Sequence, residues 1–481
     1  MGSNPSIAMH TLEQLRSGAL AGLTRLDLSA GLTALPPEVY GLADTLEVLN
    51  LSGNRLTDLP HDLTRFKKLK VVFGSDNAFT HLPEVLGDCP QLQMVGFKAN
   101  RIAHVSAAAL PPALRWLILT DNAVERLPPE LGQRPALQKL MLAGNRLTHL
   151  PETLAAASQL ELLRLSANRL ETLAGWLTEL PALAWLALSG NPAVAAHAQP
   201  GVDAASPGGV APAFTVPNVP RVDWAQVAVG PRLGEGASGH IHHAQVVAGV
   251  APVTDPATQA LHGQLLALKL FKGAMTSDGL PHDELAASLA AGPHPALCTP
   301  VAQVVGHPQG LLGVLLPLIP STHTVLAGPP SLASCTRDVY DPALRLSPAV
   351  AHTLALDLAQ AVAHLHARGV MHGDLYAHNT LWHPGTGHAR LSDFGAATVL
   401  THLPATTRQA LLALEVRAFG LLLQELAERL ADAGGAHAPG PLLHLAQACA
   451  QPLPQARPPM GEVVAALDAL DALNALNALN F

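Results

Sequence analysis

The sequence predicts an α+β protein of several domains, in which a solenoid of short repeats precedes a domain of strands followed by helices. Its 481 residues correspond to about three domain equivalents at roughly 150 residues each. Three observations lead to this prediction. Leucines recur at a fixed interval near the N-terminus, a Pro/Ala/Gly-rich segment follows, and beyond it strand-like runs precede two long helical patterns.

The composition excludes several classes of protein. Apolar residues make up 49% of the chain and charged residues 13%, which excludes wholesale disorder. The net charge of −8 argues against a dedicated nucleic-acid binder and against a polybasic membrane anchor. The longest apolar run, residues 311–319, is too short to span a bilayer. Because the four cysteines are widely spaced and the start lacks a signal-peptide pattern, we expect a cytoplasmic protein with no nucleic-acid partner and no membrane span.

The first part of the chain is dominated by a repeat with the pattern LxxLxLxxN. Its units begin 23 residues apart, with one interval of 22, and an asparagine stands eight residues into seven of the eight units. The first leucines of the units are Leu23, Leu46, Leu69, Leu92, Leu114, Leu137, Leu160 and Leu183. We expect the leucines to point inward and the asparagine amide to satisfy backbone groups of the following turn. Stacking of the units then builds one continuous core.

This repeat resembles the leucine-rich repeat family over about residues 20–195, and the resemblance implies a horseshoe-shaped solenoid for the domain 1–195. Alternate strand residues, which point away from the leucine core, form an apolar stripe on the concave face. Exposed apolar stripes often mark partner sites. An equally good alternative is that the second domain or a terminal segment covers the stripe. The candidate partner-binding residues are Phe73, Met94, Trp116, Ile118, Met141 and Trp185.

After the repeats the chain becomes rich in Ala, Pro, Gly and Val and almost free of charge, as an extended tether would be. We assign residues 196–221 to this linker, 222–470 to a second domain, and 471–481 to a low-complexity tail whose simplest form is a fraying helix. Strands are expected in the second domain at 225–229, 265–270 and 311–316, and helices at 347–368 and 410–430.

Glycines early in the second domain predict a phosphate-binding hairpin. Residues 233–241 read LGEGASGHI, and glycines let a hairpin lie against phosphates and donate N–H groups without a side-chain clash. A Rossmann turn shares this spacing, but here another strand follows instead of a helix. That strand, LALKLFK, carries Lys269, whose ammonium needs a carboxylate to orient it. We expect Glu284 to do this, with Asp283 as the competing candidate.

Two later motifs carry the residue types that phosphoryl transfer requires. Residues 372–379 read HGDLYAHN, and residues 393–395 read DFG. In a phosphotransferase an aspartate accepts the hydroxyl proton, while an asparagine and a second aspartate hold Mg²⁺ on the phosphates. Asp374, Asn379 and Asp393 have the spacing that this chemistry needs.

Together the four motifs resemble the eukaryotic-like protein kinase family over residues 222–470, and the whole chain resembles a leucine-rich repeat protein kinase of bacterial type. The resemblance implies a bilobal protein-kinase-like domain with ATP in the cleft between the lobes and Mg²⁺ on Asn379 and Asp393. It also implies a catalytic set of Asp374, Lys269, Glu284 and Asn379. The implied ATP-binding residues are Leu233, Gly234, Gly236, Gly239, Ile241, Ala267 and Lys269. The implied activity is transfer of the γ-phosphate of Mg·ATP to protein Ser or Thr hydroxyls, with Tyr kept open, and the repeats would recruit a protein substrate or regulator.

The chain departs from the kinase pattern where a peptide would dock. Gly373 replaces the arginine of HRD, and Tyr376 replaces the lysine that Ser/Thr kinases carry two residues after the catalytic aspartate. No APE motif occurs in the 22 residues from Asp393 to Glu415, which stands where aspartate is usual. Arg457 resembles the arginine that would pair with the missing APE glutamate. Two alternatives therefore stay open: a small-molecule phosphotransferase resembling aminoglycoside or choline kinases, and a pseudokinase scaffold.

Overall fold

The computed structural model describes residues 9–195, 219–236, 238–247, 256–273, 275–276, 278–430 and 440–479. They divide into two compact units, one of residues 9–183 with Asn191–Ala193 and one of Ala184–Gly190 with the residues from 194 onward. The segment Ala184–Gly190 is thus part of the second unit, although in sequence it lies within the last repeat. The predicted linker 196–221 lies outside the described residues except for its last three positions.

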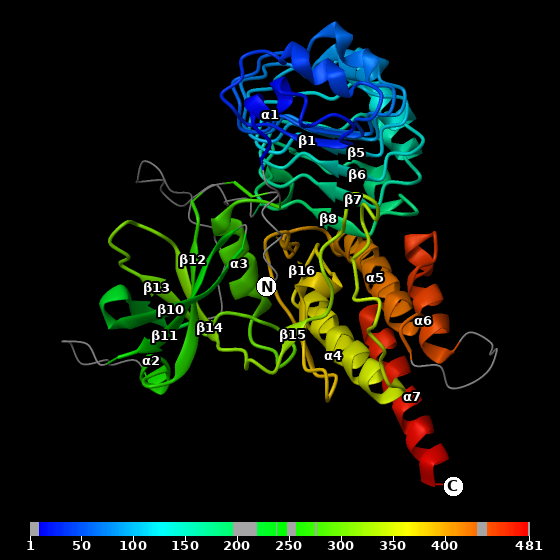
Figure 1. Cartoon of the computed structure of the whole chain (residues 1–481). Helices are drawn as coiled ribbons and strands as arrows, with labels where there is room; N and C mark the ends of the chain where they lie inside the picture. The colour runs from blue at the N-terminus through cyan, green and yellow to red at the C-terminus, as the bar shows by residue number, and fades with distance from the viewer. Residues whose placement is uncertain are drawn as a thin grey trace. The chain divides into compact units, whose positions relative to one another are not determined.

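In the first unit, each repeat contributes one short strand to a parallel sheet (Figure 1). A helix α1 (Leu12–Arg16), capped by Thr11, precedes the sheet. The strands follow one another in sequence order, and Val48 pairs with both Arg25 and Val71 in unbroken register. The strands of this unit are β1 (Arg25–Asp27), β2 (Val48–Asn50), β3 (Val71–Phe73), β4 (Met94–Gly96), β5 (Trp116–Ile118), β6 (Lys139–Met141) and β7 (Leu162–Arg164), while β8 (Trp185–Ala187) belongs to the segment of the second unit.

The core of this unit consists of the repeating leucines, and the asparagines connect one repeat to the next. Asn145 accepts from the N–H of Val124 at 3.0 Å and donates to the carbonyl of Leu119 at 2.8 Å, both in the preceding repeat. The return segments of the repeats are 3₁₀ helices, several of which follow a Leu-Pro step. They are η1 (Pro37–Leu42), η2 (His61–Arg65), η3 (Glu84–Asp88), η4 (Ala107–Ala109), η5 (Pro129–Gln133), η6 (Glu152–Ala156), η7 (Gly175–Thr178) and η8 (Pro192–Val194).

The second unit begins with a six-stranded sheet in the order β10-β11-β12-β14-β13-β9 (Figure 1). The edge strand β9 starts at Arg221, inside the predicted linker, and pairs in parallel with β13. Valines and leucines of these strands form the core of this lobe, and Leu268 and Leu315 are fully buried there. The elements are β9 (Arg221–Asp223), η9 (Trp224–Gln226), β10 (Val227–Glu235), β11 (Gly239–Val246), α2 (Pro256–Ala260), β12 (Leu265–Phe271), α3 (Pro281–Ala291), β13 (Ala302–Val305) and β14 (Gly313–Pro317).

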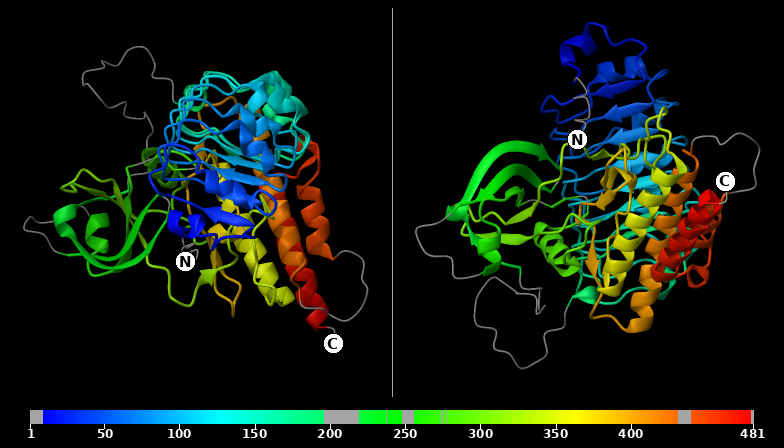
Figure 2. Two further views of the ribbon diagram at one scale, coloured as in Figure 1. Left: turned by 45° about the horizontal axis from the view of Figure 1, so that its top comes forward. Right: turned by 90° about the horizontal axis from the view of Figure 1, so that it is seen from below.

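The rest of this unit is a mainly helical lobe in which α4 packs along α7 and α5 along α6 (Figure 2). Ser347 caps α4 by accepting from the N–H of Val350. Two small sheets, β15-β17-β18 and β16-β19, carry the loops of the candidate site. The elements are β15 (Thr324–Val325), α4 (Pro348–Ala367), β16 (Val370–Met371), η10 (Ala377–Asn379), β17 (Thr380–Trp382), β18 (Ala389–Leu391), β19 (Thr398–Val399), α5 (Ala405–Ala427), α6 (Pro441–Cys449), η11 (Pro454–Ala456) and α7 (Met460–Leu479).

These elements refine the sequence-based boundaries. The predicted strand 225–229 starts at Val227 and runs on to Glu235, and helix α5 starts at Ala405 instead of residue 410. The predicted tail from residue 471 continues helix α7 to Leu479. Within the part of the chain that the structure describes, no helix is both long and apolar enough to cross a bilayer.

Candidate active site

The glycine-rich segment forms the hairpin between β10 and β11. Gly234 pairs with Ile241 across the hairpin, and the N–H of Gly236 donates to the carbonyl of Gly239 at 2.9 Å. A Cβ at Gly236 would meet nothing within 4 Å, whereas a Cβ at Gly239 would lie 2.5 Å from the carbonyl oxygen of Leu270 on β12. Gly239 is therefore needed for the close packing of β11 on β12, and Gly236 leaves open space along the hairpin.

Ile241, Ala267 and Lys269, which are expected at the nucleotide, share one face of this sheet. Ile241 pairs with Lys269 across β11 and β12, and directly opposed residues project to the same side. Ala267, two residues before Lys269 on β12, lies on that side as well and is buried. Leu233, on β10, is 43% exposed. The hairpin and β12 thus place an apolar surface next to one ammonium group.

Lys269 forms an ion pair with Glu284 of α3, as the kinase resemblance implies. The pair is well shielded, because the side chain of Lys269 is 14% exposed and that of Glu284 is 5% exposed. The ring of Phe271 lies below the ammonium, 5.0 Å from the nitrogen to the ring centroid. Asp283, the competing candidate, contacts His282 at 3.2 Å instead. The structure therefore selects Glu284 over its neighbour.

Burial raises the pKa of Glu284 above its ordinary value, and the nearby carboxylate of Asp393 adds to the rise. The ammonium of Lys269 acts in the opposite direction. This coupling shows that Glu284 and the aspartate of the DFG motif lie within electrostatic range of each other. A Cβ on Gly395 would also lie 3.9 Å from the carboxylate of Glu284. The Lys269–Glu284 pair and the DFG segment therefore belong to one site.

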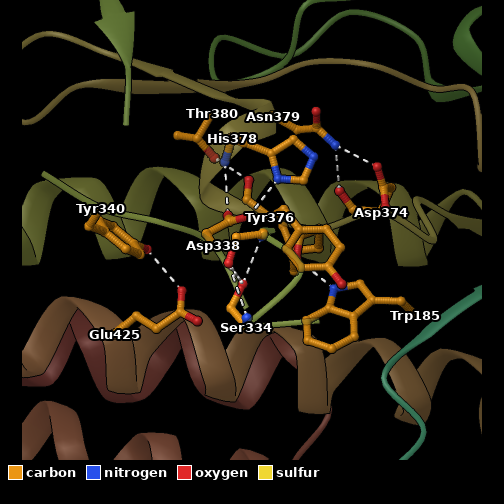
Figure 3. Close-up of polar contacts among 12 residues, drawn as sticks. Trp185, Ser334, Asp338, Tyr340, Asp374, Tyr376, His378, Asn379, Thr380 and Glu425 are labelled. Carbon is orange, nitrogen blue, oxygen red and sulfur yellow. Dashed lines mark hydrogen bonds and ion pairs between the residues drawn. The ribbon is translucent and has the colours of Figure 1, made fainter. Parts of the chain in front are cut away.

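The residues of the HGDLYAHN motif form a hydrogen-bonded loop (Figure 3). The amide nitrogen of Asn379 donates to the side chain of Asp374 at 2.7 Å and to its backbone carbonyl at 3.0 Å. His372 is buried, and its imidazole contacts both the N–H of Asp374 and the carbonyl of Ser392. These bonds fix the orientation of the Asp374 carboxylate, which is half-buried.

The DFG segment is connected to this loop through Ser392, the residue just before Asp393. Ser392 donates to the carbonyl of Asn379 both from its hydroxyl, at 2.8 Å, and from its N–H, at 2.9 Å. Asp393 has φ +64°, in the left-handed region that L-residues seldom adopt. Its carboxylate accepts from the N–H of Gly395 at 3.1 Å. Strained backbone that the surrounding structure holds in place is frequent at functional sites.

These side chains fit Mg·ATP in their chemistry. Asn379 and Asp393 offer an amide oxygen and a carboxylate, which are hard oxygen ligands of the kind that Mg²⁺ prefers. The amide nitrogen of Asn379 is already used on Asp374, so its oxygen is the atom left for a metal. Across the described residues no group of three His, Cys, Asp or Glu side chains is arranged to hold a metal.

Glu415, in the middle of α5, is hydrogen-bonded to the start of the HGDLYAHN loop. Its carboxylate accepts from the N–H groups of His372 at 3.1 Å and Gly373 at 2.6 Å, and it pairs with His366 at 2.9 Å. Burial opposes the charged form, but the hydrogen bonds from His366 and Gly373 hold the pKa of Glu415 below its ordinary value. The sequence marked this position as unusual, and the structure shows what the longer side chain does there.

Gly373, which replaces an arginine of the kinase pattern, occupies a position closed to larger residues. Its φ is +73°, and an added Cβ would lie 2.7 Å from the carbonyl oxygen of Ala396. The segment between the DFG motif and α5 is short, because α5 already begins at Ala405. Arg457, whose glutamate partner is missing, donates instead to the backbone carbonyls of Ala413 and Gln451. Burial lowers the pKa of Arg457 to about 10.

The residues expected on the concave repeat face lie on successive strands of the sheet. Phe73, Trp116 and Ile118 are half-buried, while Met94 and Met141 are buried. The ammonium of Lys139 lies 4.2 Å from the centroid of the Trp116 ring. Trp185 differs from these, because it is 2% exposed and packs within the second unit on Leu375 and Tyr376.

No sequence motif points to Asp338, which contacts the HGDLYAHN loop from a segment without a motif. Its carboxylate accepts from the N–H of His378 at 3.0 Å and pairs with its imidazole at 2.7 Å. Burial opposes protonation of His378, but the hydrogen bond that its imidazole donates to Asp338, together with the charges of Asp338, Asp374 and Asp393, raises its pKa overall. A pairing across 40 residues leaves no spacing signal, so sequence patterns could not have revealed it.

Comparison with known families agrees with both halves of the chain. Residues 112–170 and 135–192 match a family model described as leucine rich repeat, and residues 45–66 match another with the same description. Residues 331–412, which contain the catalytic loop and the DFG motif, match the protein kinase domain. The chain therefore combines leucine-rich repeats with a segment of protein kinase type.

Individual relatives match over short stretches. The chain is 36% identical over 124 residues to the transforming growth factor beta activator LRRC32 of Pongo abelii, covering 24% of this chain and 19% of that protein. It is 31% identical over 92 residues to the PH domain leucine-rich repeat-containing protein phosphatase 1 of Homo sapiens, covering 19% of this chain and 5% of that protein. The chain thus spans a fifth or less of the length of these relatives. A solved leucine-rich repeat protein of Leptospira interrogans is 28% identical, with a TM-score of 0.32, covering 38% of this chain and 52% of that one.

Proposed function

We propose that this protein is a kinase that transfers the γ-phosphate of Mg·ATP to hydroxyl groups of a protein substrate. The observation that carries the proposal is the joint presence, in one compact unit, of the Lys269–Glu284 ion pair and the Asp374–Asn379 hydrogen bond. The first is suited to holding ATP phosphates, and the second to orienting an acceptor hydroxyl. The protein kinase match over residues 331–412 supports the same class of chemistry.

Each side chain then has a defined task. Lys269, oriented by Glu284, binds the α- and β-phosphates, and the glycine hairpin lies along them with its N–H groups. Asp374 accepts the proton of the acceptor hydroxyl, whose oxygen attacks the γ-phosphorus as ADP leaves. Asn379 keeps the carboxylate of Asp374 in place. Mg²⁺, held by Asn379 and Asp393, would neutralise charge on the phosphates. Catalysis on this plan comes mainly from positioning and charge stabilisation.

The acceptor in this proposal is a protein Ser or Thr hydroxyl, with the repeats recruiting the substrate or a regulator. The apolar residues of strands β3 to β6, from Phe73 to Met141, are the proposed contact surface. Protein recognition is a common use of extended solenoid surfaces. The protein is proposed to act in the cytoplasm, in keeping with its four free cysteines.

A second candidate is transfer to a small molecule. It is favoured by one observation: the chain reaches α5 at Ala405, soon after the DFG motif, and leaves little room for a peptide-binding segment. Under this alternative the ATP side of the site works in the same way, and only the acceptor differs. A scaffold that binds nucleotide without transfer is the third reading. The sequence and the site do not favour it, because each group needed for transfer is present.

The test is transfer of radiolabelled γ-phosphate from Mg·ATP by the full chain. Wild type is compared with Lys269→Met and Asp374→Asn, and with the control Asp357→Asn, whose carboxylate pairs with His388 on the surface. Label that enters the chain or a generic basic protein, is lost in the first two variants and persists in the control, supports a protein kinase. Label that appears only on a metabolite supports the small-molecule acceptor. Nucleotide binding without any transfer would contradict both proposals.

A further inference from the structure

Trp185 packs against the catalytic loop of its own compact unit (Figure 3). Its indole N–H donates to the carbonyl of Leu375, the residue after the proposed catalytic base, at 3.0 Å. Its ring stacks on Tyr376, with centroids 4.3 Å apart and planes inclined by 6°. The guanidinium of Arg337 lies 5.1 Å from the centroid of the Trp185 ring. One aromatic side chain thus fixes two consecutive residues next to Asp374.

The same short segment also contacts the chain after the DFG motif. The N–H of Leu188 donates to the hydroxyl of Thr398 at 3.1 Å, and Thr398 is 1% exposed. Thr398 is paired with Met371, just before the catalytic loop, in the small sheet of β16 and β19. The carbonyl oxygen of Leu186 lies so close to Gly373 that an added Cβ would be 2.6 Å from it. Residues 185–188 therefore touch two segments at the same time: the loop of the HGDLYAHN motif, here called the catalytic loop, and the residues between the DFG motif and α5, here called the activation segment.

These contacts occur where the kinase pattern has lost its usual connection. Gly373 stands where the protein kinase pattern has an arginine, and in protein kinases phosphorylation orders the activation loop through new pairs with arginine. Residues 396–414 contain no Asp or Glu either, so neither side of a charged pair is present. A catalytic loop needs a fixed geometry, because a displacement of about 1 Å can lower the rate about 100-fold. The pairing of β16 with β19 joins the start of the loop to this segment, and the contacts of residues 185–188 add to it.

We propose that Trp185 is a positioning residue of the phosphotransfer site, which together with the backbone of Leu188 holds the catalytic loop against the activation segment without phosphorylation. The proposal rests on the proposed function and deepens it, because it assigns the device that keeps the site assembled. The contacts involve a ring stack and hydrogen bonds between uncharged groups, so they do not depend on a modification. By this inference the last strand of the repeat sequence is also part of the enzyme.

The experiment compares Trp185→Ala, Trp185→Phe and Thr398→Val in the full chain. Trp185→Phe keeps an aromatic ring for Tyr376 but loses the N–H donor, and Thr398→Val removes the acceptor of the Leu188 N–H with little change in shape. Trp224→Ala is the matched control, because Trp224 is also a packed tryptophan of this unit but lies against His307 on the first lobe. Turnover, KM for ATP, melting temperature and hydrogen exchange of residues 372–380 are measured for each.

We expect Trp185→Ala to lower kcat by about 10-fold to about 100-fold, while KM for ATP stays within about twofold. Trp185→Phe and Thr398→Val should lie between this variant and wild type, and residues 372–380 should exchange faster in all three. The Trp224→Ala control should leave this exchange unchanged. Turnover of Trp185→Ala equal to that of wild type would overturn the proposal. Higher turnover would also overturn it, because it would show that the contact restrains the enzyme. The proposal would also be overturned if the loss of turnover in each variant followed its loss of melting temperature and Trp224→Ala lost as much turnover as Trp185→Ala.

The hydrogen-exchange measurement separates this proposal from the proposed function. If wild type transfers no phosphate to any acceptor, the proposed function fails, and exchange still reports whether residues 185–188 hold the loop. Faster exchange confined to 372–380 and the neighbourhood of Thr398 would support the positioning role even then. Unchanged exchange in Trp185→Ala and Thr398→Val would overturn it regardless of activity.

Discussion

Replacing Glu284 by glutamine tests the assignment of the Lys269 partner. Lys269 and Glu284 are 14% and 5% exposed, so the substitution leaves a largely desolvated ammonium without its counter-charge. Removing one partner of a buried pair typically costs about 3–5 kcal/mol. We expect about 3 kcal/mol, the lower end, because glutamine keeps an acceptor oxygen and the ring of Phe271 still faces the ammonium. If this cost falls on nucleotide positioning, kcat/KM for ATP drops about 100-fold.

The neighbouring carboxylate offers a matched control. Asp283→Asn makes the same change of charge one residue away, and burial already raises the pKa of Asp283, so its neutral form is tolerated. We expect this variant to keep kcat/KM for ATP within about threefold of wild type. Steady-state kinetics at varied ATP and urea unfolding measure the two consequences separately. The reasoning is refuted if both variants lose the same activity, or if Glu284→Gln behaves as wild type.

Three further predictions concern the repeats and the support of the catalytic loop. Asn145→Ala removes buried hydrogen bonds to Val124 and Leu119, and should lower the free energy of unfolding by roughly 3 kcal/mol in urea titrations; a loss below about 0.5 kcal/mol would contradict the asparagine ladder. Because the folded pKa of Glu415 lies below 4.5, its carboxylate stabilises the fold above that pH and this contribution is lost as pH falls through the folded pKa. Glu415→Gln should therefore flatten the acid side of a plot of melting temperature against pH, and an unchanged slope would argue against the assignment. Gly373→Arg should reduce both activity and melting temperature, because of the positive φ and the crowded Cβ position; a more active variant would show that the loop tolerates the family residue.

The repeats could be predicted from the sequence because their signal is periodic. Eight units spaced by 23 residues, with one interval of 22, identify the strands and the asparagine positions without reference to any long-range contact. The family models that match leucine-rich repeats confirm this prediction. Helix α4 was also foreseen within a residue at each end, because Ser347 supplies a local cap. The repeat strands and helix α4 could thus be predicted because residues close together in the sequence determine them.

The contacts between residues of the site depend on tertiary packing and were harder to predict from the sequence. Adjacent acidic residues on α3 differ in role because only one faces β12, and the sequence could rank Glu284 and Asp283 but not settle their orientation. The bonds of Arg457 go to backbone carbonyls, which every residue possesses and no motif marks. The residues that contact Trp185, such as Leu375, lie about 190 positions away in the sequence. Such contacts carry no spacing signature.

One pattern unites the places where this chain departs from the kinase sequence. At these places a side chain contacts the backbone: Glu415 the N–H groups of His372 and Gly373, Arg457 the carbonyl of Ala413, and Trp185 the carbonyl of Leu375; Glu415 also pairs with the side chain of His366.

These bonds need no phosphate group, so we expect a loop held in this way to stay in place without a modification. A regulator of this site would therefore have to move the residues that donate or accept these bonds. Because one of those residues, Trp185, lies in the last repeat, a ligand that displaces residues 184–190 would change catalysis without entering the ATP site.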